Sequence, residues 1–244
     1  MQMKIVGLIP ARGGSKKVLN KNIKKFCGKP LIAWAIINAK KSNLSRLIVS
    51  TDSPKIAKVA RRYGAEVPFL RPAELAIDTI GIEPTLKHVY EWLINEERYS
   101  ADALALLMPT NPLRQTFHIN EAISIFKKNK TDSVIAVNET PANHTPFWTL
   151  VKTNSRVRLF GDIDLRDIHT RRQDFPHKCY ARNDLIYILK PQNLFENKPN
   201  LYGNRVELYP TNPIYEVDLN THEEWVLAEL RFRQLLKSKF GQKG

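Results

Sequence analysis

The chain has 244 residues, of which 43% are hydrophobic and 25% charged, as in an ordinary globular protein with one large domain. It carries 38 lysines and arginines against 24 aspartates and glutamates, which gives a formal net charge of +14. No apolar run is long enough to span a membrane, the opening MQMKIVGLIPARGG has no signal-peptide core, and two cysteines are too few for a disulfide framework. We therefore expect a cytoplasmic protein with no membrane partner, whose charge serves either solubility alone or the binding of anions.

Apolar runs and amphipathic stretches alternate along the first part of the chain. The runs that predict strands are 4–10, 46–52, 65–70, 102–109 and 132–138, and the stretches that predict helices are 30–42, 54–64, 83–97 and 116–129. Such alternation predicts an α/β fold with a mostly parallel, doubly wound sheet that has helices on both faces.

The pattern changes in residues 139–182, which are rich in proline, histidine, aromatic residues and arginine. This segment predicts a β-rich insertion instead of another strand–helix unit. Strand patterning returns at 184–190 and 204–210, and 224–240 predicts a basic amphipathic helix. With no linker or repeat in view, we expect a single domain over 1–244 that contains this insertion.

The loop after the first strand, in LIPARGGSKKVLNKN (8–22), concentrates flexible backbone and positive charge. Gly13 and Gly14 allow close approach of backbone N–H groups to an anion, and the nearby cations suit a triphosphate: Arg12, Lys16, Lys17 and Lys21. The spacing fits neither a P-loop nor a dinucleotide fingerprint. A solvated basic loop remains the alternative.

Several motifs occur together in one order: IPARGGSK (9–16), Lys21-Asn22, GKPLIAWAI (28–36), STD (50–52), RPAELA with Asp78, LLMPTNPLR (106–114) and RRQD (171–174). Over nearly the whole chain this series resembles the acylneuraminate, or nonulosonate, cytidylyltransferases, which make CMP-activated sialic, legionaminic and pseudaminic acids. The 3-deoxy-octulosonate cytidylyltransferases share fold and chemistry, but their first loop differs from ARGGSK.

The resemblance implies a Rossmann-like nucleotidyltransferase fold, a homodimer formed through the small insertion, and CTP, an acidic sugar and Mg²⁺ as ligands. The anomeric hydroxyl of the sugar would attack the α-phosphate of CTP. The residues implied for catalysis are Arg12, Lys21 and Asp218. Those implied for nucleotide binding are Ala11, Arg12, Gly13, Lys16, Lys21, Asn22 and Arg71, and those for sugar binding are Met108, Thr110, Arg172 and Gln173, with Arg171 as a near alternative to the arginine.

The stretch YEVDLNT (215–221) supplies candidate ligands for the metal. In a strand, Glu216 and Asp218 would point to the same side, and carboxylate oxygens are what Mg²⁺ prefers. The family pattern is Asp-x-Asp, so Glu216 is longer by one methylene group. Solvated carboxylates at an exposed strand end are the alternative.

Three positions depart from the family pattern. Met108 replaces a glutamine that is placed against the sugar, DTIGI (78–82) lacks the family's serines, and Asp184 stands where the family has glycine. These changes leave the nucleotide chemistry in place and the identity of the sugar open.

Two other functions remain as alternatives. One is a nucleotidyltransferase for another acid, such as a 3-deoxy-octulosonate, and the other is a non-catalytic protein that binds nucleotides or nucleic acid. A nucleic-acid binder is expected to have a basic stripe with exposed aromatics. The informative cations here gather in one glycine loop, so we expect no nucleic-acid partner.

Overall fold

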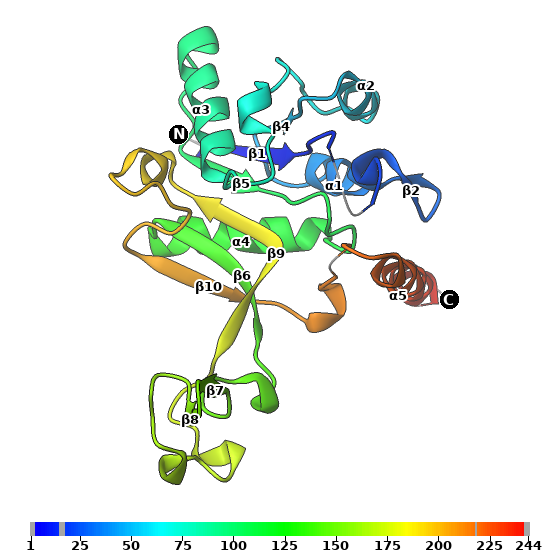
Figure 1. Cartoon of the computed structure of the whole chain (residues 1–244). Helices are drawn as coiled ribbons and strands as arrows, with labels where there is room; N and C mark the ends of the chain where they lie inside the picture. The colour runs from blue at the N-terminus through cyan, green and yellow to red at the C-terminus, as the bar shows by residue number, and fades with distance from the viewer. Residues whose placement is uncertain (1–2, 15–17, 218, 242–244) are drawn as a thin grey trace. The chain divides into compact units, whose positions relative to one another are not determined.

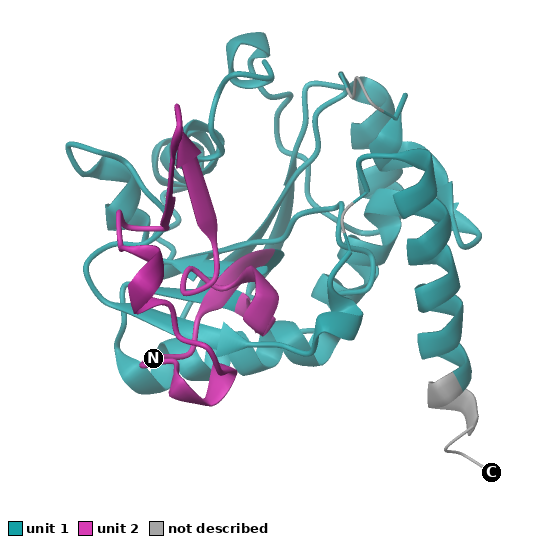
Figure 2. Cartoon of the chain, turned by 60° about the horizontal axis from the view of Figure 1, so that its bottom comes forward, with its two compact units in different colours: residues 1–136, 184–244 teal, residues 137–183 magenta. Residues whose placement is uncertain are grey.

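The computed structural model describes residues 3–14, 18–217 and 219–241, with side chains of the last range up to Lys237. The chain forms two compact units, one of residues 1–136 and 184–244 and the other of residues 137–183 (Figure 2). The second unit overlaps the predicted insertion of 139–182. In the described part of the chain, no helix has both the length and the apolar character needed to cross a bilayer.

A six-stranded sheet forms the centre of the first unit, in the order β10-β6-β9-β5-β1-β4 (Figure 1). Its strands are β1 (Ile5–Pro10), β4 (Arg46–Ser50), β5 (Ala103–Leu106), β6 (Ser133–Glu139), β9 (Tyr180–Leu189) and β10 (Val206–Pro210). Strand β1 pairs in parallel with β4 and β5, whereas β9 pairs with β5 in antiparallel fashion. The expected α/β fold is confirmed, with a mixed sheet that is mostly parallel.

The helices follow the predicted order. They are α1 (Leu31–Lys40), α2 (Pro54–Arg62), α3 (Glu83–Glu97), α4 (Thr116–Asn129) and α5 (His222–Gly241). The 3-10 helices are η1 (Lys21–Ile23), η2 (Ala73–Leu75), η3 (Ala142–His144), η4 (Leu165–Asp167), η5 (Arg172–Asp174), η6 (Pro191–Phe195) and η7 (Pro213–Tyr215). Strands β2 (Lys25–Phe26) and β3 (Lys29–Pro30) form a small hairpin, as do β7 (Leu150–Thr153) and β8 (Arg156–Leu159).

The central strands of the sheet are buried on both faces. Ile5 and Ile9 belong to a core cluster with side chains of α1, α2 and α4. Successive side chains of a strand point to opposite faces, so Val6 and Leu8, which are fully buried, pack on the other face. Continuous burial of β1 explains its unbroken apolar sequence.

The strand expected over 65–70 is wrong. In the described residues it is reduced to a single parallel bridge between Glu66 and Ile48. Pro68 has no N–H to donate to a ladder, so the pairing does not continue through it.

Asp132 fixes the start of β6 against the segment that leads into β10. Its carboxylate accepts hydrogen bonds from the N–H groups of Asn204 and Arg205, at 3.1 and 2.9 Å, and pairs with Lys190 at 2.8 Å. The hydrogen bond from Lys190 lowers the pKa of Asp132. Gly203 has φ +66°, and a Cβ there would lie 2.6 Å from the Asp132 Cβ.

We predict that Gly203→Ala destabilises the protein in urea unfolding by about 1–3 kcal/mol more than Gly28→Ala. Gly28 also has positive φ, +87°, but no atom lies within 4 Å of its built Cβ. The control therefore carries only the backbone strain of about 1–2 kcal/mol. Equal losses for the two variants would show that the close approach to Asp132 has no energetic weight.

Candidate active site

The loop that leaves β1 begins at the ends of β1 and β4. The Ala11 N–H donates to the Ser50 carbonyl at 2.9 Å, and the Gly13 N–H donates to the Asp52 carboxylate at 2.8 Å. A Cβ at Gly13 would lie 3.0 Å from the Ser53 Cβ, so a small residue suits this approach. The Gly13 N–H thus binds a carboxylate here, and its role as a hydrogen-bond donor to phosphate stays a prediction. Lys16 lies outside the described residues.

The far end of the loop is anchored by apolar packing. Val18 and Phe26 are buried in a cluster with Trp225 and Phe232 of α5, and the Phe26 ring meets the edges of both aromatic rings, with centroids 5.6 and 5.5 Å apart. Leu219 lies in the same cluster. The segment is therefore part of the core, which argues against a merely solvated basic loop.

Asn22 is buried, 5% exposed, and belongs to η1. Its Nδ2 donates to the Arg12 carbonyl at 3.0 Å, which sets the direction of the amide. Within the described residues, Asn22 Oδ1 is buried without a hydrogen-bond partner. A buried acceptor left open in this way is normally satisfied by water or a ligand.

Arg71 is 6% exposed, and its backbone N–H donates to the Thr51 carbonyl at 2.8 Å, just after β4. Its guanidinium donates to the carbonyls of Ser50, at 2.8 Å, and Leu75 and to the Thr85 hydroxyl, both at 3.3 Å, while its Nε has no partner among the described residues. Burial lowers the pKa of Arg71, the charge of Asp52 raises it, and the charge of Arg12 lowers it further. Arg71 and Arg12 therefore lie close enough to repel each other.

The Arg12 guanidinium forms an ion pair with Asp78, which follows the RPAELA motif. The two side chains are 38% and 31% exposed, so the pair is open to solvent. An anion that binds Arg12 through the same nitrogen atoms has to displace this carboxylate. The pairing could not be predicted from the sequence, because Arg12 and Asp78 are far apart in the chain.

Lys21 connects the loop to the segment around the predicted metal ligands. Its Nζ donates to the Leu219 carbonyl at 2.7 Å and to Asn220 Oδ1 at 3.4 Å. Leu219 directly follows Asp218 in sequence, and Asp218 itself lies outside the described residues. Lys21 thus contacts the chain beside Asp218, and Asn22, its neighbour in sequence, contacts Arg12.

The strand expected over 215–221 is wrong in its described residues. Glu216 follows η7, and neither it nor Val217 or Leu219 lies in a strand. Pro213 starts the 3-10 turn, and such a turn does not place side chains two residues apart on one side as a strand does. Glu216 lines a cavity of about 390 Å³ along α5, together with Glu224 and Arg231.

The described residues do not by themselves complete a magnesium site. Within them, no group of three or more histidine, cysteine, aspartate or glutamate side chains could hold a metal ion. The geometric reason for pairing Glu216 with Asp218 is also lost.

The sugar-binding residues predicted in the first unit follow β5. Met108 and Thr110 are partly exposed, in a turn in which the Asn111 N–H donates to the Met108 carbonyl at 3.4 Å. Arg114, which our sequence analysis did not single out, is fully buried and donates to the Met108 carbonyl at 2.6 Å. A lone arginine after Pro-Leu carries no sequence signal of burial.

Arg172 and Gln173 belong to the second unit. Both are exposed and line a cavity of about 700 Å³ there, whereas Arg171 pairs with Asp174 at 2.9 Å. Their predicted part in sugar binding is untested.

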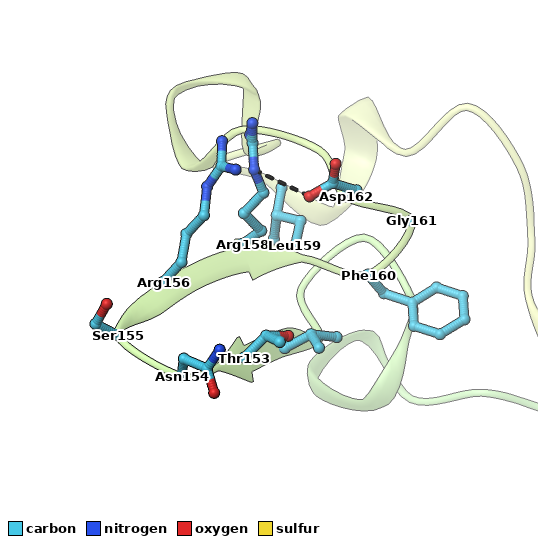
Figure 3. Close-up of a pocket in the computed structure, with 10 residues that line it drawn as sticks. Thr153, Asn154, Ser155, Arg156, Arg158, Leu159, Phe160, Gly161 and Asp162 are labelled. Carbon is cyan, nitrogen blue, oxygen red and sulfur yellow. Dashed lines mark ion pairs between the residues drawn. The ribbon is translucent and has the colours of Figure 1, made fainter.

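The β7–β8 hairpin carries another cavity of the second unit, of about 630 Å³. Arg156 and Arg158 project from β8 to the same side, and Arg158 reaches the Asp162 carboxylate at 3.1 Å (Figure 3). None of the predicted site residues lines it.

Comparison with known proteins identifies relatives over nearly the whole chain. A family model described as Cytidylyltransferase matches residues 6–235. The chain is 35% identical to a CMP-N,N'-diacetyllegionaminic acid synthase of Legionella pneumophila, over 93% of this chain and 95% of that protein. It is also 35% identical to a pseudaminic acid cytidylyltransferase of Campylobacter jejuni, over 98% and 100% of the two chains.

Solved structures share the fold. A CMP:2-keto-3-deoxy-manno-octonic acid synthetase complexed with CTP matches with a TM-score of 0.65 at 16% identity, covering 96% of this chain and 99% of that one. A 4-diphosphocytidyl-2C-methyl-D-erythritol synthase of Anaerococcus prevotii matches with a TM-score of 0.65 at 10% identity, over 95% and 96%. The chain belongs to the cytidylyltransferase family and is a CTP-dependent nucleotidyltransferase.

Proposed function

We propose that this protein transfers the cytidylyl group of CTP to the anomeric hydroxyl of a nonulosonic keto-sugar acid, releasing pyrophosphate. The observation that carries the proposal is the convergence of Arg12, Asn22 and Arg71 around the loop after β1, with buried polar atoms left open. The names of the relatives at 35% identity support a nine-carbon acid. The octulosonate alternative has support from the fold alone.

The open atoms match the edge of cytosine in polarity. Asn22 Oδ1 is an acceptor and suits the exocyclic amino group, whereas Arg71 Nε is a donor and suits a ring acceptor of the base. Uracil presents a carbonyl where cytosine has its amino group, so it would leave the Asn22 acceptor unpaired and face it with a second acceptor. Such a site disfavours UTP, because the Asn22 oxygen and the uracil carbonyl would both lose water without gaining a hydrogen bond.

Arg12 and Lys21 are the proposed partners of the triphosphate. Phosphoryl transfer depends on positioning and on neutralising charge at the oxygens of the phosphates, and both side chains are cations at the edge of the loop. A divalent cation belongs to the same proposal, with Asp218 as its protein ligand, and when bound it would supply further neutralisation of the phosphates. Glu216 is left out of this set because its strand placement is wrong.

A homodimer through the second unit is the proposed assembly. Seven apolar side chains of this unit are between 37% and 58% exposed: Leu150, Val151, Val157, Phe160, Ile163, Leu165 and Ile168. Exposed apolar side chains are expected where two protein surfaces meet, and these all lie in one unit. Sedimentation equilibrium is expected to give twice the chain mass, and a monomer at micromolar concentration would contradict this assembly.

The reaction is tested by pyrophosphate release from CTP with Mg²⁺ and a panel of nine-carbon and eight-carbon keto-sugar acids. We expect turnover with at least one nine-carbon acid and thermal stabilisation by CTP above that by UTP, ATP or GTP. Equal protection by all four nucleotides would refute base reading, and turnover of eight-carbon acids alone would select the octulosonate reaction.

Arg12 and Asp78 are expected to have opposite effects on CTP binding. Arg12→Ala removes a charge-assisted contact and should weaken CTP roughly 10- to 100-fold in calorimetry. Asp78→Asn removes the competing carboxylate, and because an exposed ion pair is worth about 0.2–1 kcal/mol, CTP should bind up to about fivefold more tightly.

Arg62→Ala is the matched control, since Arg62 is an exposed arginine at the end of α2. Its CTP affinity should equal that of the wild type. Weaker CTP binding by Asp78→Asn would mean that Asp78 orients Arg12 for the nucleotide and does not compete with it.

A further inference from the structure

Arg114 brings two distant parts of the first unit together. Its Nη2 donates both to the Met108 carbonyl, at 2.6 Å, and to the Asp184 carbonyl, at 3.3 Å, and its Nε donates to the Leu185 carbonyl. Two carbonyl oxygens that share one donor nitrogen lie no more than about 6 Å apart. Met108 and Asp184 are therefore neighbours, and two departures from the family pattern fall at one place.

The two side chains at this place differ in what they offer a ligand. Met108 is partly exposed and has a thioether, which is at most a weak acceptor. Asp184 is exposed, and within the described residues its carboxylate contacts only the Tyr187 hydroxyl, at 3.5 Å. A carboxylate has about four lone-pair sites, so most of its hydrogen-bonding capacity is open. Of the two side chains, Asp184 is therefore the one that can accept strong hydrogen bonds from a ligand.

Unsatisfied polar groups lie in the turn just beneath. Asn111 is 1% exposed, and neither polar atom of its amide has a partner among the described residues, nor has Arg114 Nη1. Buried polar groups are nearly always hydrogen-bonded in complete structures, to protein, water or ligand. Water or ligand atoms normally complete the hydrogen bonds of such groups.

The charge of Arg114 makes a carboxylate tolerable beside an acidic substrate. Burial lowers the pKa of Arg114, and the charge of Asp184 raises it, so the two charges attract each other across the turn. An acid bound nearby is then repelled less than it would be by Asp184 alone.

We propose that Asp184 is a specificity-determining residue, whose carboxylate accepts hydrogen bonds from hydroxyl or acylamino N–H groups of the acceptor acid at the point where Met108 makes none. This inference rests on the proposed function and names the chemistry of its acceptor subsite. It predicts that the protein requires a hydrogen-bond donor on the acid at the position that faces Asp184.

The experiment compares wild-type protein with Asp184→Ala and Asp184→Asn, using the best acid of the panel and a set of its analogues that each lack one hydroxyl or acylamino group. We expect the wild type to lose about tenfold or more in kcat/KM with one analogue, and Asp184→Ala to show no such preference. With the best acid, Asp184→Ala should have a higher KM for the acid than the wild type and the same KM for CTP. Asp184→Asn retains one acceptor oxygen and should be intermediate.

Controls separate this role from others. Glu96→Gln removes an exposed carboxylate from α3 and should leave every constant unchanged. If Asp184→Ala has a lower melting temperature and loses kcat/KM equally for all acids, Asp184 only neutralises Arg114. If only kcat falls, Asp184 is a proton acceptor. Either result overturns the proposal. Absence of turnover by the wild type with every acid would instead refute the proposed function, and this inference with it.

Discussion

The carbonyl oxygen of Ser50 is the point on which the candidate site depends. At the end of β4 it accepts one hydrogen bond from the Ala11 N–H and another from Arg71 Nη2. One backbone atom thus fixes both the start of the loop after β1 and the buried arginine proposed to read the base. Since β1 and β4 are neighbouring parallel strands with largely buried side chains, this geometry is set in the core of the sheet.

The electrostatics of the site follow from that arrangement. Arg12 and Arg71 are held close enough to repel each other. The negative charge of Asp52 acts on Arg71, and Asp78 forms an ion pair with Arg12. Desolvation makes the buried Arg71 costly, and its carbonyl partners provide no full counter-charge. A polyanion bound at Arg12 would relieve the repulsion, which gives a physical reason for nucleotide binding beyond the resemblance of motifs.

Much of the fold could be predicted from the sequence, because amphipathic periodicity is a local property. Helices α3 and α4 have the predicted bounds, and β1 and β4 begin or end within two residues of theirs. The antiparallel direction of β9 could not be predicted, since a buried apolar run reads the same in both directions. The motifs also predicted Arg12, Asn22 and Arg71 together, but not the burial of Arg114 or its contact with Asp184, which depends on pairing between distant segments. The 215–221 strand failed because a prolyl turn outweighed a short alternating pattern.

The packing of Phe26 against Trp225 and Phe232 has a consequence for how the protein is made. Cys27 and Glu229, which hydrogen-bond in the same region, are 202 residues apart. A nascent chain emerges from its N-terminus, so the loop after β1 leaves the ribosome well before its apolar partner α5 has been synthesised. Fragments that end before α5 would lack this anchor, so we expect the packing of the loop to be completed only once α5 has emerged.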